Sequence, residues 1–245
     1  MRNIKLTIEY DGKDFNGWQK QPDKLNIQGT IEQAIKSITG EEVELNASGR
    51  TDAGVHAIGQ VANFKTNSQI PIEKFAIAIN SKLKRSIVIK KAEEVDERFH
   101  SRLSCKKKTY RYVINNSEEG TAIYRNLETH IPQKLNIEKM KYAVKYFEGE
   151  HDFKAFKASG TSSKSSVRTI YEANVYNEGE KIFIELTGNG FLYNMVRIIA
   201  GTLVFAGNGK INWEDMSDII ASCDRKRAGI TAPACGLYLT EVFYS

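Results

Sequence analysis

The sequence is poor in the residues that build metal sites and disulfide frameworks. It has three cysteines: Cys105, Cys223 and Cys235. Its four histidines are His56, His100, His130 and His151. The cysteine count is odd and no CxxC pair occurs, which argues against a disulfide framework and against a zinc site. Because the histidines are scattered without ligand spacing, we expect no dependence on a metal.

Long apolar runs are also absent, and none approaches the roughly 20 residues that cross a bilayer. The opening MRNIKLTIEYDG alternates polar and apolar residues from its third position, which indicates a strand and not a signal peptide. Of the 245 residues, 41% are hydrophobic and 27% are charged, a balance typical of a globular chain. We expect a cytoplasmic protein with one large domain or two of ordinary size.

The positive charge is modest in amount but clustered along the chain. Lysine and arginine number 35 against 30 aspartates and glutamates, a net charge of +5. The four clusters are Lys82, Lys84 and Arg85; Lys106, Lys107 and Lys108; Lys154, Lys157, Lys164 and Arg168; and Arg225, Lys226 and Arg227. Such clusters suit a polyanion, because each contact with a phosphate releases counterions. Taken singly, they are more often solvated surface.

The first part of the chain alternates strands and helices. Strands are predicted over residues 4–10, 57–66 and 86–92. A helix is predicted by apolar residues at helical spacing, Ile27, Ile31, Ile35 and Ile38. Thr30 and Gln33 fit a capping box for this helix, and a second helix is expected to begin near Pro71.

A similar pattern resumes after the basic link at 104–108. Strands are predicted over 108–115 and 236–244, a hairpin over 166–187 turning at NEGE, and helices over 137–147, 192–206 and 212–223. Asn212 is expected to cap the last of these helices. Short turns between strands imply antiparallel sheet, so the predicted class is α+β with two similar halves, 1–105 and 106–245. The Ser-, Gly- and Lys-rich stretch 155–166 indicates a loop able to hold phosphates, or a plain surface linker.

Asp52 is the first candidate for chemistry. It lies two residues after Arg50, between Gly49 and Gly54, just before a predicted strand. The plain interpretation is a turn in which the aspartate bonds its own backbone. The functional one is a carboxylate held ionised by Arg50 or another arginine, and able to act as nucleophile or base. On spacing alone the two interpretations are evenly balanced.

Arg197 is the second candidate, because it interrupts the otherwise apolar helix in NGFLYNMVRIIAG. A guanidinium buried alone costs several kcal/mol, so a buried Arg197 needs an anion as partner. Alternatively it faces solvent and shares one side of the helix with Asn194, three residues earlier. The apolar neighbours favour the buried interpretation.

Tyr110 is the third candidate, since it follows Lys106, Lys107 and Lys108 in a predicted strand. Aromatic rings beside positive charge stack single-stranded or flipped bases. For any one strand tyrosine a place in the core is the better expectation, and Tyr112 shares its face.

Several separated motifs carry a family likeness. GRTDAGVHAIGQVANF, YRYVI, GFLYNMVR and APACGLYL occur in that order, and IEYDGKDFNGWQKQP, NIQGTIEQAI, HDFKAF and SSVRTI accompany them. The chain resembles the TruA family of tRNA pseudouridine synthases from end to end. Several motifs in the same order are far more specific than any one of them.

The resemblance implies a role for each candidate residue. Asp52 matches the catalytic aspartate and Arg50 its neighbour in the motif. Tyr110 matches the tyrosine that contacts the target base, Arg197 the arginine that pairs with the aspartate, and Leu237 the leucine beside the uracil. The resemblance also implies a pseudouridine-synthase fold with a basic central cleft, a homodimer that binds tRNA, and neither cofactor nor metal.

The implied reaction is isomerisation of uridine to pseudouridine at positions 38, 39 and 40 of the tRNA anticodon arm, on a base taken out of the stack. Three alternatives stay open. The first alternative is a non-catalytic RNA-binding module. The second is a phosphotransferase or hydrolase that uses Asp52, and the third is a synthase acting on another RNA site. The second is disfavoured because no further acidic group has suitable spacing to hold a metal.

Overall fold

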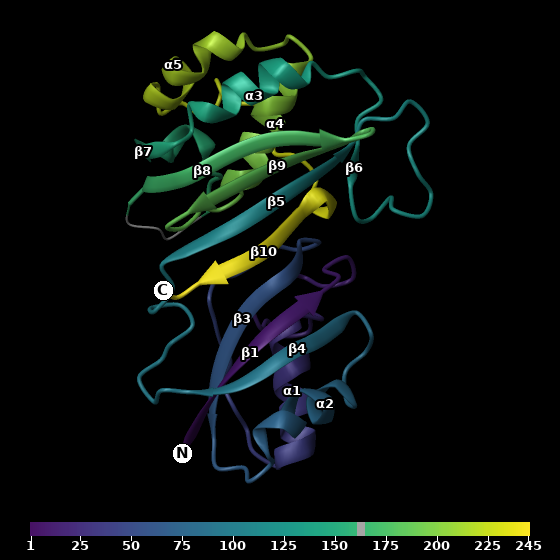
Figure 1. Cartoon of the computed structure of the whole chain (residues 1–245), viewed down its shortest axis with the longest axis vertical. Coiled ribbons are helices and arrows are strands. Elements are labelled where there is room, and N and C mark those ends of the chain that lie inside the picture. Colours follow the sequence, from purple (N-terminus) through teal and green to yellow (C-terminus); the bar gives the residue numbers. More distant parts are fainter. Residues whose placement is uncertain (161–164) are drawn as a thin grey trace. The chain divides into compact units, whose positions relative to one another are not determined.

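The structure is a computed structural model that describes residues 1–160 and 165–245 (Figure 1). Lys164 of the third basic cluster and part of the predicted loop 155–166 lie outside the described residues. The chain divides into two compact units. Unit 1 is Met1–Lys106 with Tyr238–Ser245, and unit 2 is Lys107–Leu237.

Unit 1 is built on a mixed sheet. Its strands are β1 (Arg2–Tyr10), β2 (Asn46–Ala47), β3 (His56–Thr66), β4 (Ile87–Val95) and most of β10 (Leu237–Phe243). β1 lies between β4 and β3 and is antiparallel to both, and β2 pairs antiparallel with Ala62 and Asn63 of β3. β10 is parallel to β3, with Tyr238 opposite His56. Alternate residues of β1, namely Ile4, Leu6, Ile8 and Tyr10, point into the core.

Two helices complete unit 1: α1 (Ile27–Thr39) and α2 (Ile72–Asn80). The capping box predicted at Thr30 was wrong. The N-cap is Asn26, whose side chain accepts a hydrogen bond from the amide of Gly29, and Thr30 lies within the first turn. Starting the helix at Ile27 places that residue and Ile31 in the core, so burial of the apolar stripe determines where the helix begins.

Unit 2 has a mainly antiparallel arrangement of strands. Its strands are β5 (Lys107–Asn115), β6 (Thr129–His130), β7 (Gly149–Asp152), β8 (Val167–Glu178) and β9 (Lys181–Gly188). They pair antiparallel in the order β5-β9-β8-β7, and the short β6 is parallel to β5. The predicted hairpin is confirmed as β8 and β9, with Gly179 at φ 57° in its turn.

The described residues of unit 2 form three α-helices: α3 (Ile137–Lys145), α4 (Met195–Gly207) and α5 (Met216–Ala221). Short 3-10 turns cover Phe153–Phe156, Trp213–Asp215 and Ala234–Gly236. The continuous helix predicted over 212–223 was wrong, since a 3-10 turn precedes α5. The side chain of Asn212 donates to the Glu214 carboxylate and does not accept from the helix backbone.

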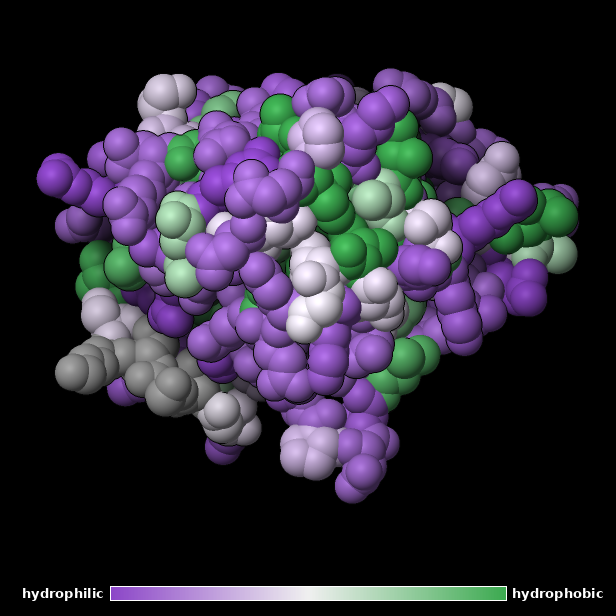
Figure 2. Space-filling model, turned by 90° about the horizontal axis from the view of Figure 1, so that it is seen from below, coloured by the Kyte–Doolittle hydropathy of each residue, from purple (hydrophilic) through white to green (hydrophobic). Residues whose placement is uncertain are grey.

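The α+β class is confirmed by these two units. No helix within the described ranges is long and apolar enough to cross a membrane. Figure 2 shows mostly hydrophilic residues on the face seen from below, with smaller groups of hydrophobic residues between them. That mixture is typical of a water-exposed protein surface.

Candidate active site

Asp52 lies in unit 1, in the loop that joins β2 to β3. Its side chain is half-buried, whereas Arg50 is exposed. Arg50 makes no hydrogen bond or ion pair with any residue in the described ranges, so it does not hold the Asp52 carboxylate. Two other residues of the loop, Ser48 and Thr51, are buried.

The segment that follows β1 forms backbone hydrogen bonds with this loop through Phe15 and Trp18. The amide of Trp18 donates to the carbonyl of Thr51 over 3.0 Å, and the amide of Gly54 donates to Phe15 over 3.4 Å. Gly17 has φ +82°, and a Cβ there would lie 2.5 Å from the Thr51 carbonyl oxygen. Only glycine allows both this backbone conformation and this approach to the residue before Asp52.

The far end of the loop is held in the same way by Gly12 and His56. The amide of Gly12 donates to Nδ1 of His56 over 3.1 Å, and that ring is 1% exposed. A Cβ on Gly12 would lie 1.9 Å from the carbonyl oxygen of Val55. The His56 ring stacks on Tyr238 with centroids 4.9 Å apart, so the first residue of β3 is fixed on two sides.

Tyr110 and Tyr112 lie on the same face of β5 in unit 2. Tyr110 is 8% exposed and meets Phe191 edge to face, with ring centroids 5.1 Å apart. Tyr112 is fully buried, and its hydroxyl contacts Thr129 Oγ1 and donates to the carbonyl of Pro233 over 2.8 Å. Tyr112 is therefore the core member, whereas Tyr110 retains some exposure at the edge of the core.

Arg197 lies in the first turn of α4 and is half-buried. Its Nε donates to the carbonyl of Ala232 over 2.7 Å, and its Nη1 donates to Oδ1 of Asn194 over 2.8 Å. Both acceptors are neutral, and no carboxylate within the described part of the chain forms an ion pair with Arg197. Arg197 thus lies between the two interpretations made from sequence: it is half-buried and bonds Asn194 on the same side of the helix, and its acceptors among the described residues are neutral.

Leu237 begins β10 and is 6% exposed. The residue before it, Gly236, lies so close to β5 that a Cβ would be 2.8 Å from the Val113 carbonyl and 2.8 Å from the ring of Tyr112. The segment entering Leu237 is therefore packed directly on the strand that carries Tyr110.

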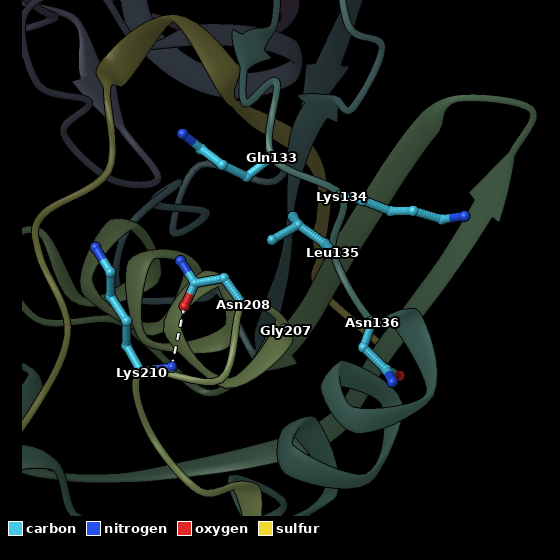
Figure 3. A pocket seen from close by; sticks show the side chains of 7 residues that line it. All are labelled: Gln133, Lys134, Leu135, Asn136, Gly207, Asn208 and Lys210. Carbon is cyan, nitrogen blue, oxygen red and sulfur yellow. Dashed lines mark hydrogen bonds between the residues drawn. The ribbon is translucent and has the colours of Figure 1, made fainter.

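The described residues also include an open pocket of about 580 Å³ in unit 2, drawn in Figure 3. It is lined by Gln133, Lys134, Leu135, Asn136, Gly207, Asn208 and Lys210. Lys134 and Lys210 come from opposite sides of it and their ammonium groups point apart. The pocket contains none of the candidate residues, so it is separate from the chemistry predicted from sequence.

No group of three or more His, Cys, Asp or Glu side chains within the described ranges is arranged to hold a metal ion. The candidate side chains in the two units are a carboxylate at Asp52, a guanidinium at Arg197 and a phenol at Tyr110. A lone carboxylate acts as nucleophile or base, and a guanidinium stabilises an anion.

Comparison with known proteins decides among the families that use such groups. A family model described as tRNA pseudouridine synthase matches residues 6–103 and 143–245. The chain belongs to the tRNA pseudouridine synthase family. The family match includes Asp52, Arg50, Arg197 and Leu237, whereas Tyr110 falls in the unmatched stretch 104–142.

Individual relatives span the unmatched stretch as well. The tRNA pseudouridine synthase A of Acetivibrio thermocellus is 54% identical over 244 residues, covering 100% of both chains. The tRNA pseudouridine synthase A of Ruminiclostridium cellulolyticum is 52% identical over 245 residues, and tRNA pseudouridine synthase A 2 of Clostridium perfringens is 54% identical over 244. Each of these matches also covers the whole of both chains.

Sequence reasoning missed the residues that hold the Asp52 loop in this member of the family. Gly12, Gly17 and Trp18 lie in IEYDGKDFNGWQKQP, a motif that carried the resemblance but received no roles. Their signal is two glycines within six residues directly after a strand, a pattern typical of a backbone that passes close to another segment.

Proposed function

We propose that this protein isomerises uridine to pseudouridine at positions 38, 39 and 40 in the anticodon stem and loop of tRNA. The proposal makes it an isomerase of the tRNA pseudouridine synthase family. The observation that carries it is Asp52, a half-buried carboxylate on a loop whose flanking residues are fixed from both sides. A reacting group held in one geometry is what proximity catalysis requires.

The reaction needs no electron or group from outside. The bond from C1′ of the ribose to N1 of the uracil breaks, the base turns, and C1′ bonds to C5. The hydrogen on C5 leaves as a proton and N1 gains one, so atoms and electrons balance without cofactor or metal. Asp52 attacks C1′, adds to the base or removes a ribose proton, and each of these three routes requires the ionised carboxylate.

The other candidates then bind the substrate. Under this proposal the first half, 1–105, carries the catalytic aspartate, and the second half, 106–245, carries Tyr110, Arg197 and Leu237. Tyr110 and Leu237 contact the extruded base, and Arg197 pairs with Asp52 or with a nearby phosphate. Arg197 uses Nε and Nη1 for Ala232 and Asn194, which leaves Nη2 for such an anion. The exposed Arg50 suits a contact with the RNA backbone.

The proposed partner is tRNA, bound in a basic cleft of a cytoplasmic homodimer. The exposed cluster Lys82, Lys84 and Arg85 supports a polyanionic partner, since these cations project into solvent. The aromatic and cationic candidates suit a base removed from its stack, at a cost of a few kcal/mol.

The test is release of tritium from tRNA whose uridines are labelled at C5, by the wild-type protein and by Asp52→Asn. We expect release by the wild type and a loss of at least about a thousandfold in kcat for Asp52→Asn, with the Kd for tRNA changed less than about threefold. Asp218→Asn is the matched control, because Asp218 is exposed on α5 of unit 2. It should retain wild-type release.

Other outcomes favour the alternatives. Tight tRNA binding without tritium release from any labelled site indicates a non-catalytic RNA-binding module. Release only from uridines outside the anticodon arm indicates the same chemistry on another RNA site. Unchanged release by Asp52→Asn would assign the chemistry to another residue.

A further inference from the structure

Four buried polar side chains lie beneath the Asp52 loop and have no role in the mechanism above. They are Tyr10, Ser48, Thr51 and Gln60, with exposed fractions of 3%, 0%, 6% and 0%. Tyr10 ends β1, Gln60 lies within β3, and Ser48 and Thr51 belong to the loop itself. Buried polar groups persist when they are hydrogen-bonded, so the bonds among these four define what they hold.

The bonds of this network end at residues 48, 49 and 51, and two of them end at a sequence neighbour of Arg50 or Asp52. The hydroxyl of Tyr10 and Oγ1 of Thr51 are 2.7 Å apart. Gln60 accepts from the hydroxyl of Ser48 over 2.7 Å through Oε1 and donates from Nε2 to the carbonyl of Gly49 over 2.9 Å. The inner side of the loop is thereby fixed at residues 48, 49 and 51.

Fixing these three residues determines which way their neighbours point. With Ser48 and Thr51 turned inward, Arg50 is exposed and Asp52 is half-buried at the surface of unit 1. The segment 48–55 contains Gly49 and Gly54, which by themselves leave the backbone many conformations. Without the side-chain bonds of this network, the loop keeps backbone hydrogen bonds at Ser48, Thr51 and Gly54.

We propose that Tyr10 and Gln60 are positioning residues, which hold Thr51 and Gly49 so that Asp52 is presented in a single geometry for the reaction. The expected effect of these residues on the reaction rests on the proposed function. Their expected effect on the conformation of the Asp52 loop does not depend on it. A displacement of about 1 Å at a reacting group costs on the order of a hundredfold in rate, so a single buried hydroxyl has a measurable effect.

The protonation state of Tyr10 agrees with this role. Burial raises the pKa of the Tyr10 hydroxyl well above its usual value, while interactions with Thr51 and Gln60 oppose part of that rise. The hydroxyl therefore keeps its proton throughout the neutral range and remains able to share a hydrogen bond with Thr51.

The experiment compares Tyr10→Phe, which removes only the hydroxyl, with Thr51→Val, which removes its partner. We expect kcat for tritium release to fall by about tenfold to a hundredfold in each, with the Kd for tRNA within about twofold of wild type. Because one bond is lost in both, the double variant should be no slower than the slower single one. Thr51→Ser keeps the hydroxyl and should restore most of the rate.

Tyr244→Phe is the matched control. Tyr244 is half-buried, and its hydroxyl donates to the carbonyl of Ser101 over 2.9 Å, also in unit 1 but outside the Asp52 loop. A loss of rate in Tyr244→Phe equal to that in Tyr10→Phe would attribute the effect to general loosening of unit 1 and overturn the proposal. Wild-type kcat in a folded Tyr10→Phe protein would overturn it as well.

Amide hydrogen exchange separates this inference from the proposed function. Residues 49–55 should exchange at least about tenfold faster in Tyr10→Phe than in wild type, since their protection depends on the closed loop. If the wild type releases no tritium, the proposed function fails and this exchange still tests the network. If the exchange is unchanged, the network does not hold the loop, whatever the reaction.

Discussion

Arg197 and Ala232 hold each other by two hydrogen bonds of opposite direction. Nε of Arg197 donates to the carbonyl of Ala232 over 2.7 Å, and the amide of Ala232 donates to the carbonyl of Arg197 over 3.1 Å. The first turn of α4 is thus fastened to the segment that leads into Leu237. A residue predicted to act as a charge also acts as a structural connection within unit 2.

Arg197→Lys should therefore reduce both stability and activity. An ammonium group keeps the charge but does not reproduce the planar fork that reaches Ala232 and Asn194 together. We expect the free energy of unfolding to fall by about 1–3 kcal/mol, and kcat to fall with it. Chemical denaturation and tritium release measure the two effects. Arg98→Lys, a change at an exposed arginine, should leave stability as it is, and an equal loss there would contradict this account.

Gly201→Ala should destabilise unit 2 although alanine favours helices. Gly201 lies in α4 where a Cβ would be 2.0 Å from the carbonyl oxygen of Ile230. The backbone cannot yield as a side chain does, so we expect a loss of about 1–3 kcal/mol by denaturant titration. Gly207→Ala in the same helix meets the flexible side chain of Met140 at 2.9 Å and should cost less. Equal stability of the two variants would refute the close contact.

Arg225 and Lys226 are neighbours in one basic cluster, and they should behave differently. Arg225 donates to the carbonyl of Gly229 over 2.8 Å and to Thr231, and burial lowers its pKa, whereas Lys226 is exposed. Arg225→Ala should lower the melting temperature. Lys226→Ala should leave the melting temperature unchanged and, if Lys226 contacts a phosphate, reduce the slope of log Kd for tRNA against log salt by about 1.

The protein should lose stability at alkaline pH through three tyrosines, of which Tyr10 and Tyr112 are buried and Tyr244 is half-buried. Burial raises the pKa of Tyr10, Tyr112 and Tyr244 above the ordinary value of 10.0. A group whose pKa is raised on folding contributes stability below its unfolded value, and that contribution is lost as the pH rises above it. The free energy of unfolding should thus fall from pH 10 upward. Phenolate absorbance should show at least three tyrosines that ionise only with unfolding, and their ionisation in the folded protein would contradict the burial.

Local patterns were sufficient for most elements. The alternation in IKLTIEY predicted β1, and the alternation on either side of NEGE predicted the β8–β9 hairpin, because side chains of a strand point to opposite faces whatever surrounds them. Helix ends were harder to predict. Thr30 matched a capping motif, but Asn26 caps α1, since burial of Ile27 added a turn to the helix.

For the candidate site, the sequence by itself determined the residue types and their order: a carboxylate between glycines, an arginine in an apolar helix, and motifs that mark the family. Only the tertiary structure decided how the Asp52 loop is held. The bonds from Tyr10 and Gln60 join residues 41 and 11 positions apart in the chain. The contact of Gly17 with Thr51 and the parallel pairing of Tyr238 with His56 join still other segments. No local periodicity encodes such contacts, because they arise only when separate segments pack against one another and their buried polar groups must find partners.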